Sequence, residues 1–125
     1  MEVLAKYVRE CFGSGVKDCR HIPGHGADAK DEQGRFFELK AYGAAAPDQV
    51  TLTKHEFARA TEMRENYYLV VVGGLDEGFE TTLTAIADPL GKLVIAPVRD
   101  LVLSGVSAHP LLRFAEDGDG TETQS

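Results

Sequence analysis

One stretch decides how this chain can fold: residues 26–42, which read GADAKDEQGRFFELKAY. Its middle, Glu32-Gln33-Gly34, has the composition of a three-residue hairpin loop, in which the glycine takes the left-handed conformation after a type I turn. Residues 27–30 and 35–42 on either side are therefore predicted to be antiparallel strands. Counting back along both strands from this loop places Asp28 directly opposite Glu38, on the same face.

The second predicted strand carries charged side chains among apolar ones. Alternation places Glu38 and Lys40 on one face and Phe37 and Leu39 on the other. Two carboxylates as close as opposed strand residues repel each other unless a proton or a cation lies between them. A hard divalent ion resolves this repulsion, so we expect Asp28 and Glu38 to bind Mg²⁺ or Mn²⁺. Lys40 would orient a water molecule or stabilise charge on an attacked phosphate.

This expectation depends on the register of the hairpin. A two-residue loop would place Asp28 opposite Phe37 and turn its side chain away from Glu38. The acid-x-Lys pattern is also weak by itself, because it occurs at residues 28–30 and again at 38–40. Both copies could be ordinary surface charges on an amphipathic strand.

The rest of the chain alternates helical and extended patterns. Apolar residues at helical spacing predict a helix over residues 2–12. A capping-box pattern, Thr53 to Glu56, opens a second helix that runs to about residue 65. The apolar and β-branched run at residues 67–72 is typical of a buried central strand. Further short strands are expected at residues 16–22, 50–52, 80–87 and 93–96. This order predicts an α/β or α+β fold, a mixed β-sheet with flanking helices.

Length and charge set limits on function. The 125 residues predict one domain, residues 1–115, followed by an acidic disordered tail, residues 116–125. The formal net charge of −7 is not that of a strong stand-alone nucleic-acid binder. The two cysteines fit neither a disulfide framework nor a zinc site. We expect an intracellular, cytoplasmic protein without a membrane span, because no signal peptide or long apolar run is present.

Four segments of the sequence together resemble the NO VEIN C-terminal domain family, namely residues 26–28, 37–40, 50–57 and 67–72. The resemblance extends over roughly residues 2–96. That family is similar to restriction-endonuclease-like PD-(D/E)xK nucleases, which implies an αβββαβ core followed here by C-terminal strands. It also implies that Asp28 is the metal-binding aspartate, Glu38 the second carboxylate and Lys40 the catalytic lysine. Glu56 matches the acid that opens the family's next helix.

The resemblance implies a Mg²⁺-dependent DNA endonuclease of DNA defence, including phage defence, or of DNA metabolism, attached to a helicase or another protein of a larger system. The alternative is an inactive nuclease-fold module for DNA binding or protein docking. A third interpretation is a homodimer formed through residues 67–72, if that strand lies at an edge. Residues that could support the site or contact DNA are His25, Glu56, Lys30, Lys54 and Arg59. Glu56 has a sufficient role in the capping box alone, and loop histidines and single surface cations are most often without function.

Overall fold

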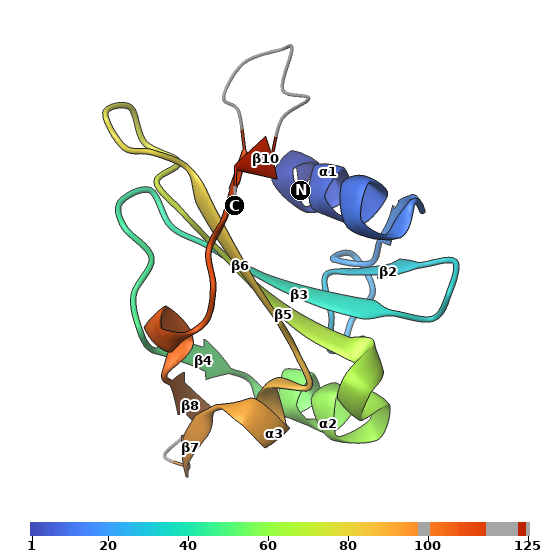
Figure 1. Cartoon of the computed structure of the whole chain (residues 1–125). Helices are drawn as coiled ribbons and strands as arrows, with labels where there is room; N and C mark the ends of the chain where they lie inside the picture. Colours follow the sequence, from blue (N-terminus) through green and yellow to red (C-terminus); the bar gives the residue numbers. More distant parts are fainter. Residues whose placement is uncertain (98–100, 115–122, 125) are drawn as a thin grey trace.

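The computed structural model describes residues 1–97, 101–114 and 123–124 (Figure 1). The elements in chain order are α1 (Glu2–Phe12), β1 (Val16–Asp18), β2 (Ala29–Asp31), β3 (Phe36–Ala41), β4 (Val50–Leu52), α2 (Lys54–Met63), η1 (Arg64–Asn66), β5 (Tyr67–Gly73), β6 (Thr82–Ala87), α3 (Pro89–Lys92), β7 (Val94–Pro97), β8 (Leu101–Ser104), η2 (Val106–Ala108), β9 (Leu112–Phe114) and β10 (Thr123–Gln124). The mixture of sheet and flanking helices confirms the predicted fold class.

The hairpin of β2 and β3 has the predicted register within its ladder, but the ladder ends at Ala29, so the predicted direct pairing of Asp28 with Glu38 is not formed. Ala29 pairs with Phe37 and Lys30 with Phe36, and Gly34 has the left-handed φ of 85° that the three-residue loop requires. Asp28 lies one residue before β2 and donates its N–H to the Phe37 carbonyl at 2.9 Å. Two consecutive residues, Asp28 and Ala29, therefore meet the single residue Phe37, as in a β-bulge.

The strands of the described residues form two sheets. The larger has the order β1-β2-β3-β5-β6-β9-β10, in which β3 and β5 are parallel and the other neighbours are antiparallel. The parallel pair requires a crossover connection, and the chain segment with β4 and α2 provides it. Because β5 lies between β3 and β6, the prediction of a central strand at residues 67–72 is confirmed. Dimerisation through this strand required a position at the edge of the sheet, and that condition is not met.

The larger sheet is covered on both faces (Figure 1). On one face α1 packs Leu4, Tyr7 and Val8 against Phe37 and the even-numbered valines of β5. On the other face Leu69 and Val71 pack against the smaller sheet, whose order is β4-β8-β7. Burial on both faces explains why β5 is apolar along its whole length. The side of β3 that carries Glu38 and Lys40 is the side toward α2, since Phe36 packs there with Ala60 and Tyr67.

The sequence also led us to expect an acidic tail and no membrane span. The acidic tail, residues 116–125, lies outside the described residues except for Thr123 and Gln124, which pair with β9. None of the helices in the described part of the chain is long and apolar enough to cross a membrane.

Candidate functional site

Lys40 joins two acidic side chains that come from different elements. Glu38 and Lys40 lie two residues apart on β3, so their side chains project from the same face. The Lys40 ammonium lies 3.3 Å from Glu38 Oε2 and 3.0 Å from Glu56 Oε1. Glu56 comes from the first turn of α2, which the crossover from β3 to β5 brings above this part of the sheet.

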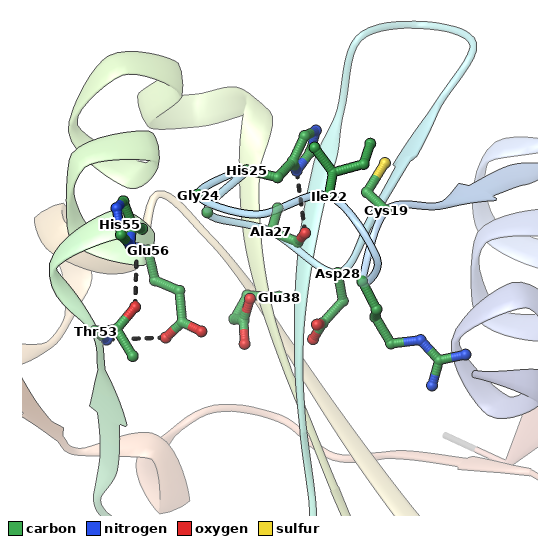
Figure 2. Close-up of a pocket in the computed structure, with 12 residues that line it drawn as sticks. Cys19, Ile22, Gly24, His25, Ala27, Asp28, Glu38, Thr53, His55 and Glu56 are labelled. Atoms are coloured by element: carbon green, nitrogen blue, oxygen red, sulfur yellow. Dashed lines mark hydrogen bonds between the residues drawn. The ribbon is translucent and has the colours of Figure 1, made fainter.

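Asp28 is held next to this group by the backbone of β3. Its Oδ2 accepts a hydrogen bond from the Leu39 N–H at 2.7 Å, which fixes the orientation of the carboxylate. Its own N–H is bound to Phe37, on the other side of Glu38. Figure 2 shows the carboxylates of Asp28, Glu38 and Glu56 in a row.

These carboxylates line a cleft of about 200 Å³. One wall is the loop between β1 and β2, with Cys19, Arg20, Ile22 and Gly24, and the opposite wall is the start of α2 (Figure 2). The loop is fixed in place: the Tyr67 hydroxyl donates to the Gly26 carbonyl at 2.8 Å, and Arg59 Nε donates to the His25 carbonyl at 2.9 Å. The cleft is therefore preformed by contacts between the loop, α2 and β5.

The electrostatics of the cleft depend on the burial of Glu38, whose surface is only 3% exposed. Burial, together with the nearby charges of Asp28 and Glu56, raises the pKa of Glu38 to about 9, although Lys40 opposes this. The group therefore holds a proton at neutral pH when no cation is bound. Burial lowers the pKa of Lys40, but the negative charges of Glu38, when it is ionised, and of Glu56 outweigh this and hold that pKa above its ordinary value, so Lys40 is charged.

The donor set fits a small divalent cation. Mg²⁺ usually takes one or two carboxylates and keeps several water molecules, and Asp28 and Glu38 provide two carboxylates at the same cleft. A buried carboxyl that retains its proton at neutral pH is a group that a cation would stabilise in the ionised form. Within the described residues, no group of three or more His, Cys, Asp or Glu side chains is arranged to hold a metal ion. Water would have to complete the coordination.

The structure brings Glu56 to the predicted site in two roles. The capping box is present: the Thr53 hydroxyl accepts from the Glu56 N–H, and Glu56 Oε1 accepts from the Thr53 N–H. The same Oε1 atom also accepts a hydrogen bond from Lys40. The capping role suggested by the sequence is therefore correct but incomplete.

The other predicted residues lie further from the carboxylates. His25 lines the cleft, but its ring is turned away from them, with Nδ1 3.1 Å from the Ala27 carbonyl (Figure 2). Arg59 is paired with Glu62 at 2.8 Å. Lys30 is exposed on β2, in a separate hollow with Lys17, and Lys54 is exposed at the start of α2.

Two cleft residues, Arg20 and His55, were missed by the sequence reasoning. Arg20 is exposed, forms a close pair with Asp18 at 2.6 Å and lies near enough to Asp28 for the two charges to interact. His55 is exposed on the first turn of α2. Its position directly before Glu56 was a usable signal, because the residues that open this helix face the cleft.

Comparison with known proteins identifies one family. A family model described as "Protein NO VEIN, C-terminal" matches residues 7–84. This range includes the second half of α1, the hairpin with Asp28, Glu38 and Lys40, the helix α2 and the central strand β5. Neither the search of curated proteins nor the search of solved structures found a match.

Proposed function

This chain belongs to the NO VEIN C-terminal family, and on that premise we propose that it is a Mg²⁺-dependent DNA endonuclease of the PD-(D/E)xK type. The observation that carries the proposal is the juxtaposition of Asp28 and Glu38 in one cleft, with Lys40 bound to Glu38. A chain with a net charge of −7 attracts DNA poorly by itself. We therefore propose that it acts within a larger system of DNA defence or metabolism, in which a partner such as a helicase delivers the DNA.

Each residue of the site has a distinct task. Asp28 and Glu38 would hold Mg²⁺ or Mn²⁺ through carboxylate oxygens, with Asp28 oriented by the Leu39 N–H. The bound metal would polarise the phosphodiester and lower the pKa of a water molecule. Lys40 keeps a positive charge beside the metal ligands, where it would stabilise negative charge that develops on the phosphate. Glu56 positions the Lys40 ammonium.

The test is cleavage of single-stranded, duplex and branched DNA with and without Mg²⁺ or Mn²⁺. We expect divalent-dependent cleavage that falls by about 100-fold or more in Lys40→Ala, the usual effect of removing one group that stabilises developing charge. Lys92→Ala removes the same charge from the exposed end of α3 and should leave the rate unchanged. If no substrate is cut in either metal, or if Lys40→Ala cuts as well as the parent protein, the proposal is wrong.

A second candidate is a nuclease-fold module that binds DNA or docks onto a larger machine without cutting. It is favoured by the small size and the net charge of −7 of the chain, which suit docking onto a partner better than independent action on DNA. Titration calorimetry separates the two candidates. Measurable DNA or protein binding, in a protein that takes up neither Mg²⁺ nor Mn²⁺, would support the module.

A further inference from the structure

A second hollow adjoins the carboxylate cleft along the outer face of α2. It has a volume of about 360 Å³ and shares Gly24, His25 and His55 with the cleft. Beyond these shared residues it is lined by Ala58 and Arg59, together with Glu62. The two hollows therefore meet at one place, where the loop between β1 and β2 approaches the first turn of α2.

The meeting point is formed by His55 and Gly24. A Cβ atom on Gly24 would lie 3.6 Å from His55 Cδ2 and 3.6 Å from Nε2, so the imidazole lies beside the glycine backbone. Figure 2 shows the two residues facing each other from the loop and the helix. A chain that has one phosphate at the carboxylates would pass this histidine to enter the second hollow.

The loop and the helix are held close together at this meeting point. A Cβ atom on Gly26 would collide with the His55 carbonyl oxygen and would lie 2.7 Å from Arg59 Cβ, so loop and helix are already in close contact. Tyr67 and Arg59 also hold this loop, through hydrogen bonds to the carbonyls of Gly26 and His25. A bulky substrate could not push the two walls apart without breaking these contacts.

Duplex DNA fits this arrangement poorly. The Glu38 carboxyl is almost fully buried, so a phosphate has to enter the cleft to approach a metal held there. Duplex affinity also depends on several phosphate contacts by cations. The two arginines nearest the hollows already pair with Asp18 and Glu62.

A single strand has the properties that the hollows select. Its backbone can bend into a narrow cleft, and its unpaired bases can stack on exposed rings or apolar side chains. His55 offers a ring where the two hollows meet, and Ile22, which is exposed, offers an apolar side chain on the cleft wall. The ion pair of Arg59 and Glu62 lines the second hollow, so a nucleoside there would lie beside a polar wall without a net charge.

We propose that the second hollow is a subsite for the nucleoside next to the phosphate at the carboxylates, and that the chain takes single-stranded DNA rather than duplex. This inference rests on the proposed function, because the cleft is assumed to receive a phosphodiester.

The test measures binding by fluorescence anisotropy in Ca²⁺, which occupies oxygen-ligand sites, with a single-stranded oligonucleotide and its duplex. We expect the single strand to bind more tightly. His55→Ala should weaken single-strand binding by about fivefold to tenfold, the loss expected from one base stack. Ala58→Glu puts a negative charge, which repels the DNA phosphates, and extra bulk into the second hollow. It should weaken single-strand binding at least as much as His55→Ala.

Thr61→Glu is the matched control, because it adds the same charge at another exposed position of α2. It should leave single-strand binding unchanged. Equal binding of single strand and duplex would overturn the inference, and so would equal effects of Ala58→Glu and Thr61→Glu. Failure of the proposed nuclease function is a different result: it is the absence of divalent-dependent cleavage, whatever the strand preference in binding.

Discussion

Replacing Glu38 by glutamine should stabilise the protein at neutral pH. Burial raises the pKa of Glu38 from its ordinary 4.5 to about 9 in the folded protein. Between these two values the folded protein holds a proton that the unfolded chain has released, so the free energy of unfolding falls as the pH rises. At pH 7 the interval above 4.5 is about 2.5 pH units, and at about 1.4 kcal/mol per unit the loss is about 3 kcal/mol.

Glutamine stays neutral at every pH and can still accept a hydrogen bond from Lys40. We therefore expect Glu38→Gln to gain about 3 kcal/mol over the parent protein at pH 7 and almost nothing near pH 4. In a chain of this length the gain corresponds to an increase in Tm on the order of 10 °C. Urea denaturation followed by circular dichroism from pH 4 to pH 9 measures the difference directly.

The control is Glu77→Gln, which removes an exposed carboxylate from the loop between β5 and β6. It should change stability little, and the change should be the same at all pH values. The reasoning is refuted if Glu38→Gln is no more stable than the parent protein at pH 7, or if the two pH profiles are parallel. Mg²⁺ adds a second readout, because a bound cation stabilises the folded state by mass action in the parent protein and not in Glu38→Gln.

Two further predictions concern the frame of the site. Gly26→Ala should lower the free energy of unfolding by more than about 2 kcal/mol, because the new Cβ collides with α2 at a residue whose φ is 80°. Gly34→Ala is the control: its φ is 85° but the space around it is open, so it should lower the free energy of unfolding by only about 1 kcal/mol. Equal losses in urea denaturation would contradict the packing argument. Asp31 is buried, which raises its pKa, but hydrogen bonds from Arg35 outweigh this and hold the pKa below its ordinary 3.8. Asp31→Asn should therefore destabilise the protein at pH 7, with a deficit that shrinks as the pH falls below about 4, and a pH-independent deficit in thermal melts would rule out this charge effect.

The sequence predicted those features of the hairpin that depend on local chemistry. Gly34 marked the left-handed position of the loop, and that one position set the register of β2 against β3. Alternation then correctly placed Glu38 and Lys40 on one face of β3, and the structure shows that this face lies away from α1. The bulge at Asp28 was not predictable in the same way, because it lies where the hairpin joins the loop between β1 and β2, and that loop contacts α2 at Gly26.

Contacts between elements that are distant in the chain could not be predicted from the sequence. His25 was a candidate because it lies three positions from Asp28, yet its ring packs toward Phe36 instead, with ring centroids 5.6 Å apart. Arg59 was a candidate DNA contact because it is a cation, but it also holds the loop through the His25 carbonyl. Spacing along the chain says little about direction in a loop, where no regular periodicity constrains the side chain.

Glu56 shows why the fold and the candidate site depend on each other. One carboxylate oxygen accepts from the Thr53 N–H and from Lys40, each at 3.0 Å. The first bond caps the N-terminus of α2, and α2 is part of the crossover that allows β3 and β5 to run parallel. The second bond holds the Glu56 carboxylate beside the ammonium of Lys40, which also pairs with buried Glu38. The helix that completes the sheet therefore also sets the charge balance of the cleft, so any shift of its first turn would move Lys40 relative to Glu38.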